Sequence, residues 1–405
     1  MQRISREQKG HNDNFCGCPE KPSKLKDLKI AISGNPFFGN YGTASMVISS
    51  IEGIIKRFPG TIFYKGSICK NIDQKNFFEV LDKKKFNLKI YGLNSRRIPI
   101  SICNPLLLFY SIKYFFLADL ILEIPGEIPS DISFFSQFCR WLLAKVLNKP
   151  FVIFGCSLGP FKYKITKKIA SFVYNRTNLV VTREEITKKY LEELGVKNLE
   201  IAADTAFLMK SEKSLQAEKE IKKFNRFAVL SIKWSYAKNK DYFEAVKEIA
   251  HLILNDNLEV VIVVHSEDDR KISEKLLNVL FSDKVHLLDS LFSPKEIKYI
   301  ISKGEFFVGS RIHSCIASIS SEVPALVLVP ISDHRGVGMM NCFGLSEYVV
   351  DPSWKKEIII NKVIEFINRK EDVVNKIKEN LGKVEEKTEN GFKILEKFIY
   401  KLEVY

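Results

Sequence analysis

The fold is decided by residues 305–330, which read EFFVGSRIHSCIASISSEVPALVLVP. An apolar run at 306–308 ends at Gly309, a segment of small residues opens near Ser310, and a second apolar run follows at 325–329. This order predicts a strand, a turn, a helix and a second strand, which form the repeating unit of a parallel sheet covered by helices. Because the ligands of such sheets bind at the carboxyl ends of the strands, we expect a binding site beside Gly309.

Arg311 and His313 stand where the first of these strands meets the helix. Backbone N–H groups and the helix dipole favour an anion at the N-terminus of a helix. A guanidinium next to a titratable imidazole suits binding a phosphate or a carboxylate while moving a proton. The alternative is that Arg311 pairs with a surface carboxylate and His313 caps the helix, and the spacing alone favours neither interpretation.

Apolar strand-like runs alternate with amphipathic helical segments along most of the chain. This alternation predicts an α/β fold with parallel, doubly wound sheets. The strands are expected at 28–33, 61–64, 87–91, 120–124, 151–155, 179–182, 227–232, 259–265, 285–288, 306–308 and 325–329. The helices are expected at 44–58, 76–84, 134–147, 164–175, 184–194, 242–255, 268–280 and 294–302.

A change in composition divides the chain into two halves. The stretch at 211–225 is charged and poor in apolar residues, which is typical of a linker. We expect Rossmann-like domains at 27–210 and 226–355, and a Lys/Glu-rich helical tail at 356–405 that packs back across one of them. Residues 1–26 are polar and charged throughout, which indicates a disordered leader and no signal peptide. Two such domains in series place their strand-end loops face to face across a cleft.

The chain is basic, with 62 Lys and Arg against 48 Asp and Glu and a formal charge of +14. The excess lies on helix-like faces without a recognisable nucleic-acid module, so no nucleic-acid partner is expected. Three explanations of the positive charge stay open: attraction to an anionic membrane surface, attraction to acidic substrates, and a genome that favours Lys. The eight cysteines form no Cys-x-x-Cys pair and no metal-ligand spacing, which indicates buried thiols in a reducing compartment.

One segment, 98–124, is long and mostly apolar. Asn104, Pro105, Lys113 and Asp119 interrupt it, and its longest uncharged stretch falls short of the ~20 residues that a membrane-spanning helix needs. The segment therefore predicts a buried or interfacial helix followed by a strand.

Three loops in the N-terminal half follow predicted strands. The loop at 34–42 has three glycines, which permit close approach of a ligand, but their spacing is not that of a dinucleotide-binding loop. The acids in 123–131, Asp131 among them, could bind sugar hydroxyls or act as a base. The loop at 155–161 carries Ser157 between two glycines and opens into a basic helix. A glycine-rich turn and a solvated loop explain the first two equally well.

Cationic and imidazole side chains follow predicted strands in both halves. They are Arg183, Lys233, His265, Arg311, His313, His334 and Arg335. The His-Ser-Glu-Asp-Asp run that begins at His265 fits a helix N-cap as well as a ligand site. Arginines and histidines at strand ends, without a metal cluster, predict a small, highly anionic ligand that is held without a metal.

Several short motifs occur in a characteristic order. The most specific is Gly-Ser-Arg-Ile-His at 309–313 with Val-Pro at 323–324. The supporting motifs are Gly-Asn-x-Gly at 39–42, Gly-x-x-x-Gly-Pro-Phe at 155–161, Thr-Arg-Glu at 182–184, and Leu-Gly-Val ahead of Ala-Asp-Thr-Ala-Phe within 194–207. In this order, and over about residues 28–352, the chain resembles the polysaccharide pyruvyl transferases, which move the pyruvyl group of phosphoenolpyruvate onto a sugar as a ketal.

The resemblance implies a fold like that of the two-Rossmann-domain glycosyltransferases (GT-B-like), with no cofactor and phosphoenolpyruvate as co-substrate. It places Arg183, Arg311 and His313 in the donor site, with His313 as the general acid/base. Arg335 stands where the family often has a Lys, which keeps the charge and changes its geometry. The other residues expected to contact substrate are Asn40, Gly42, Asp131, Ser157, Lys233, His265 and His334.

Two departures from the family pattern lie in the half where the acceptor is expected to bind. Thr43 stands where an acidic residue often follows the first-loop glycine. Pro125, Gly126 and Glu127 stand where the family usually has paired glycines. The resemblance therefore defines the donor more clearly than the acceptor.

We expect a cytoplasmic pyruvyltransferase that acts on a precursor of a cell-surface glycan. The acceptor could be lipid-linked, in which case the protein would contact the inner face of the membrane peripherally. A homo-oligomer is compatible with this reading. Two alternatives stay open: a metal-independent nucleotide-sugar glycosyltransferase of similar architecture, and a glycan-binding member of the family without catalysis.

Overall fold

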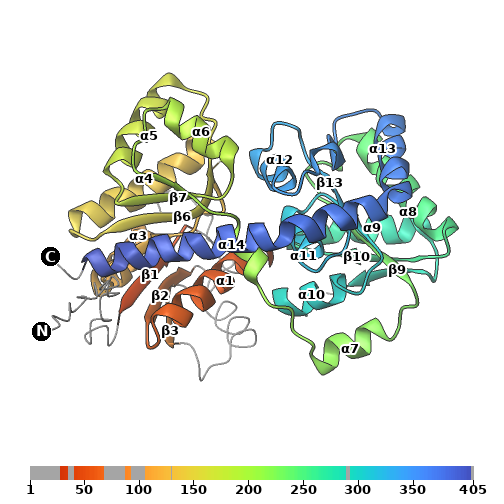
Figure 1. Cartoon of the computed structure of the whole chain (residues 1–405), viewed down its shortest axis with the longest axis horizontal. Coiled ribbons are helices and arrows are strands. Elements are labelled where there is room, and N and C mark those ends of the chain that lie inside the picture. The colour runs from red at the N-terminus through yellow and green to blue at the C-terminus, as the bar shows by residue number, and fades with distance from the viewer. Residues whose placement is uncertain are drawn as a thin grey trace, which may run out of the picture.

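The computed structural model describes residues 28–34, 41–67, 87–92, 105–128, 130–288 and 292–402. The predicted leader at 1–26 and the predicted helix at 76–84 lie outside them. Figure 1 shows two α/β lobes side by side, with helix α14 (Lys370–Leu402) running across both.

The N-terminal lobe is built on a parallel sheet in the order β3-β2-β1-β4-β6-β7-β8, and the short strand β5 pairs with β6. Its strands are β1 (Lys29–Ser33), β2 (Ile62–Ser67), β3 (Asn87–Gly92), β4 (Leu120–Glu123), β5 (Glu127–Ile128), β6 (Phe151–Leu158), β7 (Leu179–Thr182) and β8 (Leu199–Ile201). The strand order reverses between β1 and β4, and ligands of open parallel sheets bind at such a point.

The C-terminal lobe repeats this design with a parallel sheet in the order β11-β10-β9-β12-β13-β14. Its strands are β9 (Phe227–Ser231), β10 (Glu259–Val263), β11 (Val285–Leu288), β12 (Phe307–Gly309), β13 (Ala325–Leu328) and β14 (Val349–Val350). The order reverses between β9 and β12, and Gly309 pairs with Ser231 there. The predicted fold class, two doubly wound parallel sheets, is confirmed.

Helices cover both faces of each sheet. In the N-terminal lobe they are α1 (Tyr41–Arg57), α3 (Pro105–Leu117), α4 (Asp131–Val146), α5 (Lys164–Arg176), α6 (Glu185–Glu193) and the 3-10 helix η1 (Thr205–Leu208). In the C-terminal lobe they are α7 (Leu215–Ile221), α8 (Lys240–Asn255), α9 (Glu267–Leu280), α10 (Pro294–Ile301), α11 (Ile312–Ile319), α12 (His334–Asn341), the 3-10 helix η2 (Ser346–Tyr348) and α13 (Lys356–Asn368). None of the helices in the described ranges combines the length and the apolar character needed to span a bilayer.

Alternate residues of a strand point to opposite faces of the sheet and therefore belong to two separate core layers. On β1, Ile30 and Ile32 join the large core that continues into the C-terminal lobe, whereas Ala31 joins a second core under α3, α4 and α5. Both faces of the strands are buried, which explains why they read as continuous apolar runs in the sequence.

The structure departs from the prediction between and after the lobes. The predicted linker at 211–225 contains α7, because Ser214 caps a helix N-terminus by accepting a hydrogen bond from the Ala217 N–H and Ala217 is fully buried. The tail does not pack on one lobe alone. Lys376 pairs with Glu347 of the C-terminal lobe at 2.8 Å, and Phe392 lies 5.2 Å, centroid to centroid, from Phe154 of the N-terminal lobe.

The two lobes touch beside the carboxyl edges of their sheets. The Tyr41 N–H donates to the carbonyl oxygen of His265 over 3.0 Å, and Lys295 forms an ion pair with Glu52. Helix α12 approaches α6 closely, since a Cβ on Gly338 would lie 2.6 Å from Cβ of Glu184. These contacts hold the strand-end loops of both sheets against one another.

Candidate active site

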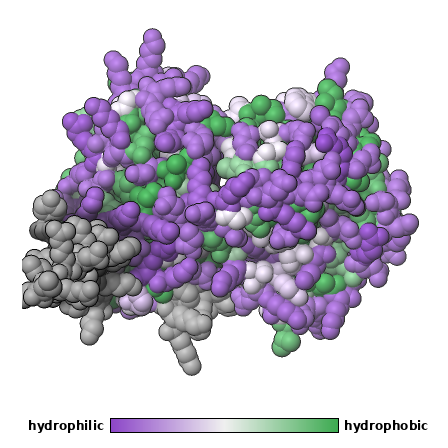
Figure 2. Space-filling model, in the orientation of Figure 1, coloured by the Kyte–Doolittle hydropathy of each residue, from purple (hydrophilic) through white to green (hydrophobic). Residues whose placement is uncertain are grey.

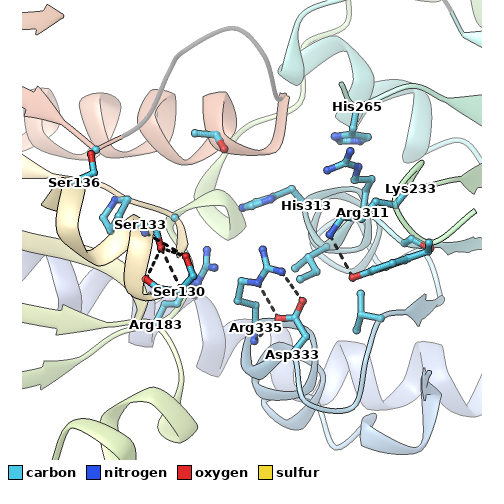
Figure 3. A pocket seen from close by; sticks show the side chains of 18 of the residues that line it. Ser130, Ser133, Ser136, Arg183, Lys233, His265, Arg311, His313, Asp333 and Arg335 are labelled. Carbon is cyan, nitrogen blue, oxygen red and sulfur yellow. Dashed lines mark hydrogen bonds and ion pairs between the residues drawn. The ribbon is translucent and has the colours of Figure 1, made fainter. Parts of the chain in front are cut away.

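A cleft of about 460 Å³ lies between the two lobes at the carboxyl edges of both sheets. Figure 3 shows Arg183 and a row of serines on its N-terminal wall, facing His313, Arg311, Arg335 and Lys233 on the C-terminal wall. The residues that line it are Gly34, Thr43, Pro125, Gly126, Ser130, Ser133, Ser136, Arg140, Arg183, Lys233, Tyr236, His265, Ser310, Arg311, Ile312, His313, Val329, Asp333 and Arg335.

The C-terminal wall is built where β9 and β12 end side by side. A Cβ on Gly309 would lie 2.3 Å from Oγ of Ser231, so only glycine lets the two strand ends pack this closely. The Arg311 N–H donates to Oγ of Ser231 at 3.3 Å. The loops that carry Lys233 and Arg311 therefore leave adjacent strands at the point where the strand order reverses.

Arg311 is fixed by two groups from the α9 region. Its Nε donates to Oδ2 of Asp269 over 2.7 Å, and its Nη2 donates to Oγ of Ser266 over 2.8 Å. Asp269 is fully buried, so this carboxylate holds the guanidinium in one position. The alternative in which Arg311 pairs with a surface carboxylate is therefore half right: the partner exists, and it lies inside the protein.

Arg183 is held in the same manner on the N-terminal wall. Its Nε donates to Oγ of Ser157 at 2.9 Å and its Nη1 to Oδ2 of Asp204 at 2.6 Å, with the arginine 5% and the aspartate 4% exposed. Burial alone would raise the pKa of the Asp204 carboxyl, but the charges of Arg183 and His313 hold that pKa well below its usual range. Asp204 is an anion, and it orients Arg183.

Each of these two arginines keeps donor capacity for a ligand. In the part of the chain that the structure describes, no hydrogen bond is formed by Nη2 of Arg183 or by Nη1 of Arg311. A guanidinium has five N–H donors in a planar fork and can serve a carboxylate on one edge while it binds an anion on another. The cleft therefore has two oriented donors on opposite walls.

His313 reaches across the junction of the lobes from the first turn of α11. Its Nε2 lies 3.7 Å from Oδ2 of Asp204, which is too long for a hydrogen bond. This nitrogen is buried and has no hydrogen-bond partner in the described ranges. An imidazole that lines the cleft and faces a carboxylate is placed to give a proton and take one back, with geometry that can tighten when a substrate binds.

Two further cations complete the C-terminal wall. Arg335 is held by Asp333 through Nε at 2.8 Å and Nη2 at 2.5 Å, in a two-point contact within the first turn of α12. Lys233 Nζ lies 3.3 Å from the Tyr236 hydroxyl and 4.5 Å from the centroid of its ring. Arg183, Arg311 and Arg335 thus each have a carboxylate partner, which lowers the net positive charge of the cleft but fixes the direction of each guanidinium.

His265 lines the cleft but is almost fully buried. It is 4% exposed, and its Nε2 is hydrogen-bonded to Oγ of Ser314. Burial, with the charges of Arg311 and His313, lowers its pKa to about 3. His265 is therefore neutral at neutral pH.

The low pKa of His265 predicts acid sensitivity of the fold. Between the unfolded pKa of 6.5 and the folded pKa of about 3, the unfolded chain binds a proton that the folded chain does not. The free energy of unfolding should therefore fall as the pH is lowered through this window, by about 1 kcal/mol per pH unit from this group. Urea unfolding at pH 7 and pH 5 should show a smaller pH dependence in His265→Gln than in the wild type. An equal dependence in the two proteins would contradict the assignment.

The N-terminal wall contains groups that the sequence did not single out. Ser130, Ser133 and Ser136 line the cleft from one face of α4, and Arg140 follows on the same face. Nη1 of Arg140 donates to Oγ of Ser136 over 2.6 Å, while its Nε and Nη2 bind Glu123, which is fully buried at the end of β4. These four residues follow a predicted strand at intervals of three and four, a spacing that places side chains on one face of a helix. This spacing is the signal in the sequence that could have found them.

Four predicted site residues lie off the cleft lining, and a fifth falls outside the described residues. Asp131 does not line the cleft, because its carboxylate accepts the backbone N–H groups of Lys162 and Tyr163 at 3.1 and 3.2 Å. Ser157 lies behind Arg183, and His334 also lies off the cleft lining. Asn40 falls outside the described residues. Gly42 does not line the cleft but packs against His313, since a Cβ there would lie 2.3 Å from Nδ1.

The pair of sheets and the cleft between them define the class of protein as a GT-B-like two-domain α/β fold. UDP-GlcNAc 2-epimerase from Methanocaldococcus jannaschii superposes with a TM-score of 0.63 at 14% identity, covering 92% of this chain and 99% of that one. UDP-GlcNAc 2-epimerase from Neisseria meningitidis, bound to UDP-GlcNAc, has a TM-score of 0.60 at 14% identity, covering 93% and 100%. At such identities the likeness concerns the fold alone.

Sequence comparison defines the family. A sequence model of the polysaccharide pyruvyl transferases matches residues 40–332, and the chain belongs to this family. The amylovoran biosynthesis protein AmsJ of Erwinia amylovora is 24% identical, with 80% of this chain and 88% of AmsJ covered. The matched region contains Arg140, Arg183, Lys233, Arg311 and His313 of the cleft lining, whereas Arg335 lies beyond it.

Proposed function

We propose that the protein transfers the pyruvyl group of phosphoenolpyruvate to two hydroxyls of a sugar in a cell-envelope polysaccharide precursor, forming a ketal and releasing phosphate. One observation carries the proposal: Arg183 and Arg311, each oriented by a buried carboxylate, meet His313 in a single cleft between the lobes. Family membership and the amylovoran biosynthesis relative support the same reaction class.

The donor fits the cations of the cleft. Phosphoenolpyruvate carries its phosphate and its carboxylate on the same central carbon, and the two oriented guanidinium groups can each bind one of these anionic groups. Lys233 and Arg335 add positive charge on the C-terminal wall. We place the phosphate on that wall, beside the N-terminus of α11, where backbone N–H groups favour it.

The reaction follows from the position of His313. Protonation of the methylene carbon of phosphoenolpyruvate gives an oxocarbenium-like centre at the neighbouring carbon, which one sugar hydroxyl attacks with loss of its proton. A second hydroxyl then displaces phosphate and closes the ketal, and its proton leaves with the phosphate. His313 supplies the first proton and takes up the proton of the attacking hydroxyl, while the cations stabilise the phosphate that departs.

The acceptor fits the opposite wall. The hydroxyls of Ser130, Ser133 and Ser136, with Arg140 beside them, present donors and acceptors of the kind that bind sugar hydroxyls. We therefore place the sugar along α4 and the donor along α11. Because phosphoenolpyruvate is a cytoplasmic metabolite, the reaction belongs on the cytoplasmic side of the membrane.

Phosphate release tests the proposal directly. Purified protein, phosphoenolpyruvate and a panel of glycan acceptors should release phosphate in amounts equal to the ketal formed, as measured by mass spectrometry of the products. Turnover of UDP-sugars with the same acceptors, and none of phosphoenolpyruvate, would support the glycosyltransferase alternative. A wild-type protein that binds glycans and turns over neither donor would support the non-catalytic alternative.

The close packing of Gly42 against His313 predicts that a larger residue at position 42 lowers the activity. A methyl group at Gly42 would overlap the imidazole, since the Cβ position lies 2.3 Å from Nδ1 and 2.7 Å from Cγ. Gly42→Ala should therefore displace His313 and lower kcat by about tenfold to a hundredfold, the scale expected for a misplaced catalytic group. Gly382→Ala is the matched control, because a Cβ at this position in α14 meets nothing within 4 Å. Equal activity of the two variants would contradict the assigned position of His313.

A further inference from the structure

Exposed apolar side chains gather on one surface of the N-terminal lobe. Of the eighteen large apolar residues that are exposed in the described ranges, eleven lie on α3, α4, α5 and the loop before α5. They are Ile112, Phe116, Leu117, Ile132, Phe135, Leu142, Val146, Tyr163, Ile165, Ile169 and Phe172. We call this the α3–α5 surface, and part of it shows as green among purple over α4 and α5 in Figure 2.

Ring contacts make this surface continuous from helix to helix. Trp141 on α4 lies 6.3 Å, centroid to centroid, from Phe172 on α5, and it stacks on Phe138 at 6.0 Å. Lys149, after α4, lies over the ring of Phe116 on α3 at 5.8 Å. The three helices also share one core layer beneath, so their outer faces form one surface.

Basic side chains interleave with these apolar groups. They are Lys113, Lys145, Lys149, Lys162, Lys164, Lys168 and Arg176. Several lie over aromatic rings, and Arg176 lies 3.8 Å from the centroid of Phe172. The surface is thus both apolar and cationic.

The nearby acids are engaged in contacts of the fold. Glu123 is buried against Arg140, and Asp131 accepts two backbone N–H groups from the start of the α5 region. Asp119 accepts the Lys29 N–H at 2.9 Å. Within the described ranges, the lysines of the α3–α5 surface therefore face solvent, and few acidic side chains lie near enough to pair with them.

We propose that the α3–α5 surface docks on the face of an anionic lipid bilayer. Apolar side chains enter the boundary between headgroups and acyl chains, while Lys and Arg stems extend to the phosphates. Anionic headgroups complement the unbalanced positive charge, and each basic residue near the surface adds to the affinity. The charge pattern distinguishes a bilayer from a protein partner, because lysine is depleted from the cores of protein interfaces and two copies of this surface would repel each other.

The surface adjoins the cleft through α4. Ser130, Ser133 and Ser136 of this helix line the cleft, whereas Ile132 and Phe135 are exposed on its other side. A bilayer bound to the surface would lie next to the wall where we place the acceptor, which suits a sugar carried on a lipid. That consequence rests on the proposed function, whereas the docking itself does not.

Vesicle co-sedimentation tests the docking without any assay of catalysis. The full-length protein should sediment with vesicles of phosphatidylcholine and phosphatidylglycerol, and much less with vesicles of phosphatidylcholine alone. The triple variant Phe116→Ser, Val146→Ser, Ile165→Ser should lower the partition coefficient about tenfold or more. The triple variant Lys145→Glu, Lys164→Glu, Lys168→Glu should lower it at least as much, and high salt should weaken the wild type in the same direction.

Two matched controls distinguish an effect of this surface from the general effect of losing exposed apolar residues or positive charge. Leu215→Ser, Phe281→Ser, Ile358→Ser removes three exposed apolar residues from the other lobe, and Lys240→Glu, Lys271→Glu, Lys378→Glu makes the same change in net charge away from the α3–α5 surface. Both controls should sediment nearly as the wild type does. No binding to anionic vesicles, or equal losses in the charge variant and its control, would overturn the proposal. Self-association by analytical ultracentrifugation that the apolar variant abolishes, without vesicle binding, would instead assign the surface to a second copy of the chain.

Discussion

Replacing His313 with glutamine should lower kcat for phosphate release from phosphoenolpyruvate by about 10²- to 10⁴-fold, the usual contribution of a general acid/base. Glutamine keeps a polar group of similar length in the cleft but cannot carry the proton to the methylene carbon. The affinity for phosphoenolpyruvate should change little, because the arginines rather than the imidazole bind the anionic groups. Fixed-time assays of phosphate release measure kcat, and titration with phosphoenolpyruvate measures the affinity for the donor.

His334→Gln is the control for this result. His334 lies on the same edge of the C-terminal lobe, in the first turn of α12, but it does not line the cleft. Its loss should leave kcat within about threefold of the wild type, as expected of a residue that does not contact the reacting atoms. A His313→Gln variant that is as active as His334→Gln would remove the proposed acid/base from the mechanism.

The second large effect is expected at Arg183. Replacing this arginine with methionine leaves the Asp204 carboxylate buried at 4% exposure without its 2.6 Å partner. Removal of one member of a buried ion pair costs about 3–5 kcal/mol of folding stability. Arg183→Met should therefore lower the free energy of unfolding by that amount in urea titrations at pH 7, and it should also abolish measurable donor binding.

A double variant separates the two roles of Arg183. In Arg183→Met, Asp204→Leu both charges are replaced by apolar groups, a change that is often close to neutral for stability. The double variant should recover most of the stability that Arg183→Met loses, while donor binding stays absent. If the double variant were no more stable than Arg183→Met, or if it bound phosphoenolpyruvate, the ion pair would not have the role assigned to it.

The fold could be read from the sequence because its information is local. The run from Phe307 to Gly309, the small-residue helix after it and the strand from Ala325 form one strand-helix-strand unit, and the same alternation recurs in both halves. Parallel strands that are buried on both faces give continuous apolar runs, which are easy to recognise. Strand-end loops gather at one edge of each sheet, and two such sheets in series face each other across a cleft, so Arg183, Lys233 and Arg311 could be placed at the same cleft.

The partners of these residues could not be read in the same way. Asp269 and Asp204 pair with Arg311 and Arg183 across 42 and 21 residues of sequence, and these contacts depend on how helices pack on the finished sheets. Asp131 illustrates the converse. It follows a strand, as a ligand would, but it begins a helix whose first turn directs the carboxylate to the backbone of the loop between β6 and α5.

The linker and the tail show how tertiary contacts override composition. The charged stretch at 211–225 contains α7, which Ser214 caps and which packs on the core through the buried Ala217 and through Ile221. Helix α14 was expected to pack on one lobe, yet its 33 residues reach from the C-terminal lobe to Phe154 of the N-terminal lobe. Its apolar spacing predicted a packed helix but could not specify the partner.

We propose that the cleft recognises a small donor with a phosphate and a carboxylate rather than a nucleotide, although the fold is similar to that of an enzyme bound to UDP-GlcNAc. Isothermal titration of the wild-type protein with phosphoenolpyruvate and with UDP-GlcNAc, in parallel with an Arg311→Gln variant, measures this most directly. We predict saturable binding of phosphoenolpyruvate that Arg311→Gln weakens by at least about tenfold, as expected for the loss of a charge-assisted contact, and no heat from UDP-GlcNAc. Binding of UDP-GlcNAc together with no response to phosphoenolpyruvate would contradict the account.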